Sequence, residues 1–121
     1  FQARAEAVKD GFLAFLLEQK AAGKSVAAYG AAAKGNTLLN FAGVRPDLLS
    51  FVCDAAEAKQ HKFLPGSHIP IHTPAALREH KPDWVVILPW NIAAEVMQQQ
   101  AGISDWGGRF VIAVPELKVL S

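Results

Sequence analysis

The stretch from Ser25 to Thr37 reads SVAAYGAAAKGNT and decides the fold. It opens with a short apolar run without alternation, which is typical of a parallel strand covered on both faces. A turn bracketed by Gly30 and Gly35 follows, and the pattern becomes helical from Lys34 onward. A buried strand that passes through a glycine turn directly into a helix is the opening unit of an α/β domain with a parallel sheet.

Outward from this unit, short apolar runs alternate with helical patterns. On the N-terminal side, Val8, Phe12 and Leu16 recur at helical spacing and predict an amphipathic helix over residues 5–22 that Gly23 ends. On the C-terminal side, Thr73 and Asn91 are the expected N-caps of two helices. We predict strands over 25–30, 48–53, 69–72, 84–89 and 109–114, and helices over 34–42, 75–80 and 91–100.

This alternation predicts a doubly wound, Rossmann-like α/β fold. We expect a parallel sheet of about five strands in the order 3-2-1-4-5, with helices on both faces, because right-handed crossovers allow few other arrangements. Ligands of such folds bind at the carboxyl ends of the strands, near the point where the strand order reverses. The sequence therefore predicts a site between the ends of the first and fourth strands.

Length and composition limit the classes of protein. The chain has 121 residues, of which 51% are hydrophobic, and we expect one domain over residues 1–121. A net charge of +1 argues against a nucleic-acid partner, and the apolar run over 84–90 is too short to span a membrane. The single Cys53 is typical of a reducing, cytoplasmic compartment. Since the chain opens at Phe1 and its only methionine is Met97, we expect a fragment of a longer protein.

The turn after the first strand is the strongest candidate for ligand binding. Helix N-termini attract anions through free N–H groups and the helix dipole. The dinucleotide pattern G-x-G-x-x-G is matched only in part, because Ala32 replaces the middle glycine. Asn36 stands where a triphosphate-binding loop needs lysine, which excludes ATP hydrolysis. The alternative is that Gly30 and Gly35 only permit a tight turn with close packing.

Polar residues at the other strand ends have two interpretations each. Asp54 could hold a ribose hydroxyl, or it could form a helix capping box with Glu57. The loop with Lys59 and His68 could neutralise an anion or be an ordinary solvated surface. Trp90 could stack on a ring and Asn91 could bond a ligand, or both could serve capping and packing.

Catalysis and metal binding are not indicated by the residues. The histidines at 61, 68 and 72 lack a recognised zinc-ligand spacing. The sequence shows no nucleophile paired with a base and no paired carboxylates, so we nominate no catalytic residue.

Four segments together resemble one family. They are YGAAAKGNT at 29–37, Asp54 with KQHKFLPGSHIPI at 59–71, LPWN at 88–91 and GRFVIAVP at 108–115. In this order they are similar to the C-terminal domain of S-adenosylmethionine-dependent C-methyltransferases, such as the sugar 3-C-methyltransferases that act on nucleotide-linked deoxysugars. The resemblance covers nearly the whole chain.

The resemblance implies a division of labour within a longer enzyme. A zinc-binding N-terminal part and a central domain that binds S-adenosylmethionine would lie outside this chain, together with the catalytic base. This domain would bind the nucleotide-sugar against the central domain and be inactive alone. The residues implied to bind substrate are Gly30, Ala31, Ala32, Lys34, Gly35, Asn36, Asp54, Lys59, Pro65, Gly66, His68, Pro89, Trp90 and Asn91.

Two other functions stay open from the sequence. The chain could be a free-standing module that binds a nucleotide or coenzyme A and regulates a partner. It could also be a degenerate Rossmann-like domain with a structural or dimerisation role. The gathering of polar residues at successive strand ends argues against a purely structural role.

Overall fold

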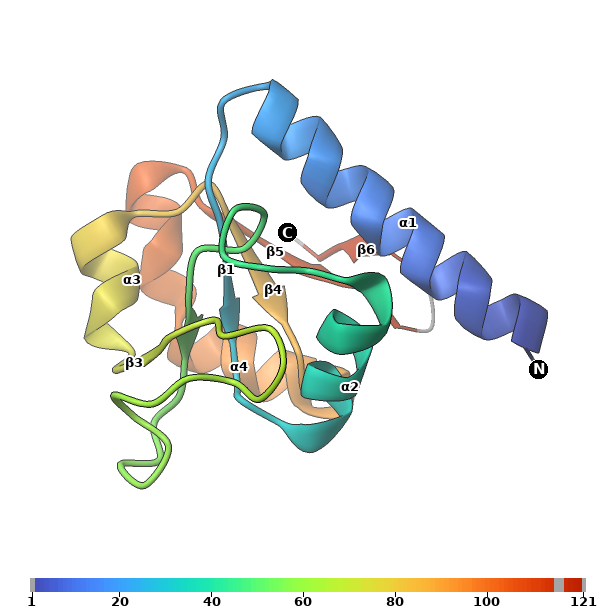
Figure 1. Cartoon of the computed structure of the whole chain (residues 1–121). Coiled ribbons are helices and arrows are strands. Elements are labelled where there is room, and N and C mark those ends of the chain that lie inside the picture. Colours follow the sequence, from blue (N-terminus) through green and yellow to red (C-terminus); the bar gives the residue numbers. More distant parts are fainter. Residues whose placement is uncertain (1, 115–116, 121) are drawn as a thin grey trace.

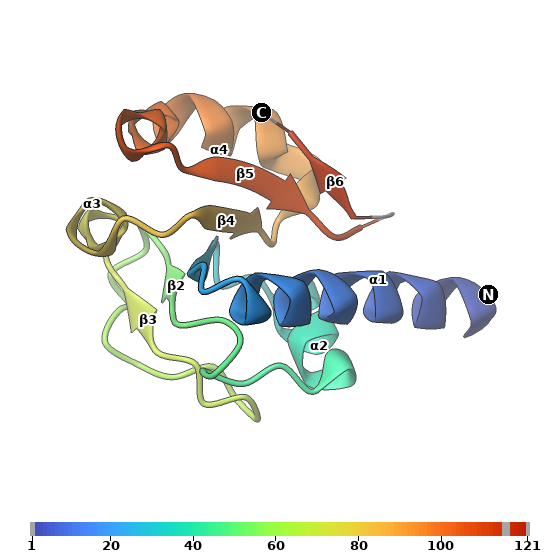
Figure 2. The same ribbon diagram turned by 90° about the horizontal axis from the view of Figure 1, so that it is seen from above.

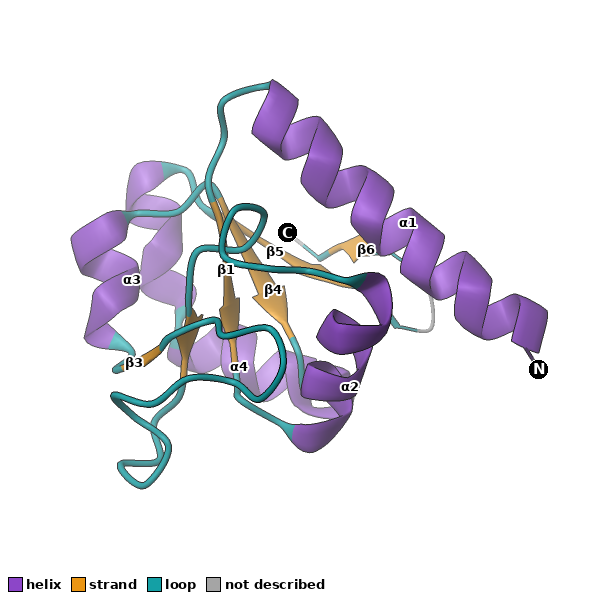
Figure 3. Cartoon of the chain, viewed as in Figure 1, coloured by secondary structure: helices purple, strands orange, loops and turns teal. Residues whose placement is uncertain are grey.

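The computed structural model describes residues 2–114 and 117–120, which form a single sheet with helices around it (Figures 1 and 3). Within those residues the sheet has six strands, in the order β3-β2-β1-β4-β5-β6. The elements along the chain are α1 (Gln2–Ala21), β1 (Val26–Tyr29), α2 (Ala33–Ala42), β2 (Val52–Cys53), β3 (Ile71–His72), α3 (Ala75–His80), β4 (Trp84–Ile87), the 3₁₀ helix η1 (Trp90–Ile92), α4 (Ala93–Gln99), the 3₁₀ helix η2 (Ala101–Trp106), β5 (Arg109–Ile112) and β6 (Lys118–Val119).

The predicted α/β class and the order 3-2-1-4-5 are confirmed for the first five strands, which are all parallel. The central strand β1 pairs with β4 through Val26 opposite Trp84 and with β2 through Tyr29 opposite Cys53. The strand order reverses between β1 and β4. The predicted count of five is wrong by one, because β6 adds an antiparallel edge next to β5.

Side chains of β1 alternate between two hydrophobic layers. Ala28 points to the layer that contains Leu16 of α1 and Leu39 of α2. Ala27 and Tyr29 point to the opposite layer, which includes side chains of α3, α4 and η2. Figure 2 shows α1 and α2 on one side of the sheet and α4 on the other. Helices therefore cover both faces, as the unalternating apolar strands predict.

Several predicted boundaries and caps differ from the structure. The helix α1 ends at Ala21, and Gly23, two residues later, has the positive φ of +75° that is typical of a glycine after a helix end. In the predicted strand over 48–53 only Val52 and Cys53 are strand, because the N–H of Leu49 instead donates to the carbonyl of Arg45 in a turn, at 3.2 Å.

Neither predicted N-cap caps its helix. The residue at the N-cap of α3 is Pro74, already in helical conformation, so Thr73 lies one residue too early. A 3₁₀ turn over Trp90–Ile92 precedes α4, which places Ile92 at the N-cap position and Asn91 outside it. No side chain caps either helix.

Candidate functional site

The turn from β1 into α2 packs tightly against the end of β4. Gly30 has a φ of +90°, and its N–H donates to the carbonyl of Cys53 at 2.7 Å. A Cβ at Gly30 would lie 2.5 Å from Cδ of Pro89, and one at Gly35 would lie 2.6 Å from Cβ of Leu88. Both glycines are therefore required by the close approach of the segment after β4.

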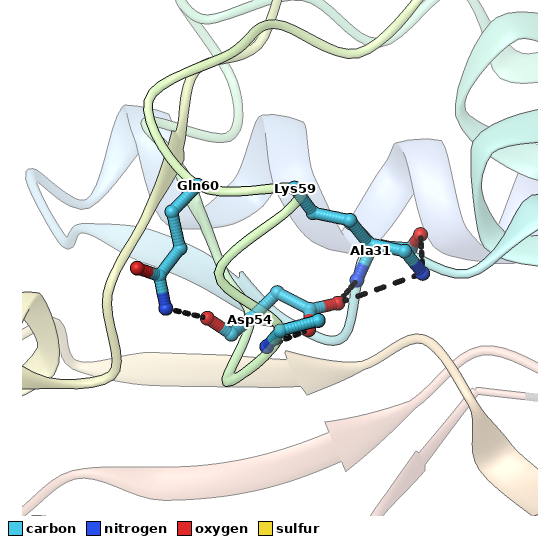
Figure 4. Close-up of polar contacts among 5 residues, drawn as sticks. Ala31, Asp54, Lys59 and Gln60 are labelled. Atoms are coloured by element: carbon cyan, nitrogen blue, oxygen red, sulfur yellow. Dashed lines mark hydrogen bonds and ion pairs between the residues drawn. The ribbon is translucent and has the colours of Figure 1, made fainter.

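Hydrogen bonds of Asp54 hold this turn against the end of β2 (Figure 4). One carboxylate oxygen accepts the N–H of Ala31 at 2.8 Å, and the other accepts the N–H of Ala56 at 2.8 Å. The capping-box interpretation is wrong, because residues 55–61 contain turns and no helix, and the N–H of Asp54 donates to the carbonyl of His72 at 3.0 Å. The side chain of Asp54 is 15% exposed, so it still reaches solvent.

The following loop is held on the same turn by two side chains. The ammonium of Lys59 donates to the carbonyl of Ala31 at 3.1 Å and lies 3.9 Å from the carboxylate of Asp54. The amide of Gln60 donates to the carbonyl of Asp54 at 2.8 Å. Figure 4 shows these groups converging from two segments that are distant in sequence. The structure thus brings together Ala31, Asp54 and Lys59, which the sequence predicts as site residues.

A crevice of about 400 Å³ lies at the carboxyl ends of β1, β2 and β4. Five of the residues that the sequence nominates for substrate binding line it: Gly30, Ala32, Asp54, Lys59 and Pro89. Its other walls were not predicted and come from Tyr29, Ala55, Ile92, Glu95, Val96 and Gln99. Burial raises the pKa of Tyr29, and a hydrogen bond with the side chain of Gln100 opposes that rise in part.

The missed residues of α4, with Ile92 of the 3₁₀ turn before it, carry a recognisable pattern. Ile92, Val96 and Gln99 follow one another at steps of four and three, which places them on one face of a helix that starts at a strand end. This spacing could have indicated them. What the sequence does not give is the direction in which that face points.

A second cavity, of about 260 Å³, lies on the other side of Ala32 and Pro89. It is lined by the predicted residues Lys34, Trp90 and Asn91, together with Ala33 and Leu88. The helix α2 starts beside it without a side-chain cap, so the N–H groups of the first turn have no capping side chain. Asn36, in the same helix, has a buried side-chain oxygen without a hydrogen-bond partner.

Six predicted residues line neither cavity: Ala31, Gly35 and Asn36 of the turn into α2, and Pro65, Gly66 and His68 of the loop after β2. The carbonyl of Pro65 accepts a hydrogen bond from the side chain of Asn40 at 3.0 Å, which holds the Pro65–Gly66 turn beside the C-terminal half of α2. His68 has a φ of +61° and donates its N–H to the carbonyl of Leu64 at 3.1 Å. A role of this loop in binding stays a prediction.

The largest of these cavities lies elsewhere. It measures about 590 Å³ and lies between α3 and η2, where the guanidinium of Arg78 is 3.2 Å from Asp105 and 5.6 Å from the ring centre of Trp106. It contains none of the predicted site residues. Within residues 2–114 and 117–120, no group of three His, Cys, Asp or Glu side chains is placed to hold a metal ion, and no helix is long and apolar enough to cross a membrane.

Comparison with known families identifies the domain. A family model described as "C-methyltransferase C-terminal domain" matches residues 1–115. The chain belongs to this family. The resemblance noted in the sequence is thereby confirmed. The domain is also 41% identical, over 99 residues, to the C-methyltransferase NovU of Streptomyces niveus. That match covers 82% of this chain and 24% of NovU, so the chain spans about a quarter of the length of this relative.

A solved structure supports the fold of this C-methyltransferase domain. The UDP-D-quinovosamine 4-dehydrogenase from Vibrio fischeri matches with a TM-score of 0.56, over 81% of this chain and 93% of that one. The two sequences are 17% identical, so the likeness concerns the fold alone.

Proposed function

We propose that this C-terminal domain binds a nucleotide-linked sugar and positions it for methyl transfer in the full-length C-methyltransferase. The observation that carries the proposal is the crevice at the carboxyl ends of β1, β2 and β4, where Asp54 and Lys59 meet the turn into α2. This is the place where the strand order reverses, and doubly wound folds bind their ligands there. The NovU relative is itself named a C-methyltransferase.

The groups at this position suit a ligand with both hydroxyl and phosphate groups. Each carboxylate oxygen of Asp54 accepts one backbone N–H, and an ionised carboxylate offers about four acceptor positions, so it has capacity for a ligand hydroxyl. The uncapped start of α2 offers backbone N–H donors to an anion. Lys34, which is exposed next to that helix start, adds a positive charge.

We assign the methyl donor to another part of the full-length enzyme. Methyl-donor domains carry an acidic, glycine-rich turn after the first strand, whereas the turn from Gly30 to Gly35 has no acidic residue and no third glycine. The residues of this turn therefore do not fit S-adenosylmethionine in the usual way. We expect the donor, the zinc and the catalytic base mainly outside these 121 residues, and no methyl transfer by this domain alone.

A lysine substitution in the full-length enzyme tests the proposal. Lys34→Met removes a charge in the first turn of α2 and leaves the hydrogen bonds of Asp54 in place. We expect the KM for the nucleotide-sugar to rise about tenfold, since a charge-assisted contact to phosphate is lost, and the KM for S-adenosylmethionine to stay unchanged. Lys24→Met is the matched control, because Lys24 is an exposed lysine just before the opposite end of β1.

Two results would contradict this function. One is an unchanged KM for the nucleotide-sugar in Lys34→Met, and the other is an equal rise in Lys24→Met. Tight binding of coenzyme A or NAD to the 121-residue chain alone would instead favour a free-standing binding module.

A further inference from the structure

The crevice and the second cavity adjoin each other at the start of α2, and we treat them as two lobes of one candidate site. Both are lined by Ala32 and Pro89, so they meet over the start of α2. We call the larger one the α4 lobe, after Glu95, Val96 and Gln99 of α4, which line it. The smaller one is the α2 lobe, with Lys34, Trp90 and Asn91. A ligand with two unlike ends could occupy both lobes and cross between them at Ala32.

The charges of the two lobes differ. The α4 lobe contains the carboxylates of Asp54 and Glu95 and one ammonium, that of Lys59, which lies 3.9 Å from Asp54. Its net charge is negative, so it disfavours a diphosphate and favours N–H and O–H donors. The α2 lobe contains Lys34 and no carboxylate, so phosphate oxygens are better placed toward that side.

The size and the wall residues of the lobes also favour a nucleoside in the α4 lobe and a sugar in the α2 lobe. The α4 lobe is the larger, at about 400 Å³ against about 260 Å³. Ile92, which is 40% exposed, and Ala55 contribute apolar surface on which a flat ring can lie, and Glu95 and Gln99 contribute polar groups. The α2 lobe has the indole of Trp90, a surface suited to the C–H groups of a sugar, and the amide of Asn91 for its hydroxyls.

We propose a fixed orientation of the substrate: the nucleoside occupies the α4 lobe, the diphosphate crosses at the start of α2, and the sugar lies in the α2 lobe on Trp90. This inference rests on the proposed function and adds to it the direction of the ligand. It makes Glu95 and Gln99 the residues that select the base, and Trp90 and Asn91 those that select the sugar. The sugar carbon that receives the methyl group is then presented from the α2 lobe.

Substitutions in the two lobes of the full-length enzyme test the direction. The probe is the free nucleoside diphosphate that binds best among dTDP, UDP, CDP, GDP and ADP, with Kd measured by calorimetry. Gln99→Ala should weaken its binding about tenfold, because a hydrogen bond from the amide to the base is lost. Gln98→Ala, an exposed neighbour that lines neither lobe, should leave the Kd unchanged.

Substitutions in the α2 lobe should act on the sugar instead. Trp90→Ala should raise the KM for the nucleotide-sugar about tenfold and change the Kd of the free nucleoside diphosphate less than about twofold. Asn91→Ala, at an exposed position, should show the same pattern more weakly and keeps the test valid if Trp90→Ala fails to fold.

The outcomes separate the orientation from the proposed function. If Trp90→Ala and Asn91→Ala weaken the free diphosphate while Gln99→Ala does not, the ligand lies in the opposite direction and the inference is overturned, although the proposed function stands. Equal effects of Gln98→Ala and Gln99→Ala also overturn it. If none of the five diphosphates binds the wild-type enzyme, the proposed function fails as well.

Discussion

Gly30→Ala should destabilise the domain through two separable effects. The φ of +90° is unfavourable for any residue with a Cβ, at a cost of about 1–2 kcal/mol. The new methyl group would also lie 2.5 Å from Cδ and 2.8 Å from Cγ of Pro89, both in a rigid ring that cannot rotate away. Such overpacking costs about 1–3 kcal/mol. We therefore expect the free energy of unfolding to fall by about 2–5 kcal/mol.

The measurement is urea unfolding of the 121-residue chain, followed by circular dichroism and tryptophan fluorescence. Gly23→Ala is the control for backbone strain, because Gly23 has a φ of +75° and nothing lies within 4 Å of its virtual Cβ. It should lose only about 1–2 kcal/mol. If Gly30→Ala is no more destabilising than Gly23→Ala, Pro89 does not pack on the turn as the structure shows, and the shared wall of the two lobes is wrong.

Two other predictions concern the end of β2. Asp54→Asn should lower the free energy of unfolding by about 1–3 kcal/mol, because an amide cannot accept the N–H groups of both Ala31 and Ala56. The control Asp47→Asn, at an exposed ion pair, should lower it by no more than about 1 kcal/mol in the same urea assay. Burial raises the pKa of the Cys53 thiol from 9.0 to about 12. The folded chain should therefore resist iodoacetamide at pH 8 and react once unfolded. Because the unfolded thiol ionises at lower pH than the folded one, Cys53 should make the free energy of unfolding fall as the pH rises from about 9 to about 12. Cys53→Ala should remove that part of the pH dependence. An equal pH dependence in both proteins would refute this prediction.

The arrangement of the sheet could be predicted because it depends on features that the sequence shows directly. Apolar runs without alternation separated by helices leave few topologies, and the order 3-2-1-4-5 is the result. The edge strand β6 was missed because it has two residues, both exposed, and so carries no burial pattern. The extent of β2 was overestimated because the apolar residues Leu48 and Leu49 enter the core from a turn, which periodicity cannot distinguish from a strand.

The candidate site could be predicted only in part, for a related reason. Asp54 and the β1–α2 turn follow strands directly, and parallel strands bring their carboxyl ends to one edge, so their meeting could be expected. Glu95 and Gln99 reach the crevice because α4 packs across the sheet through Val96. That packing depends on tertiary contacts with β1 and β4, and a local pattern does not contain them.

The two glycines of the turn show how a motif can point to the right place for a reason other than binding. Gly30 and Gly35 are explained by Pro89 and Leu88, since a Cβ at either position would collide with the segment after β4. Their presence therefore does not distinguish a phosphate site from a packing requirement. The same collisions set the distance between the turn and that segment, and Ala32 and Pro89 thereby become the common wall of the two lobes. The case for a ligand consequently depends on the unlike residues on either side of that wall, which Gln99→Ala and Trp90→Ala probe separately.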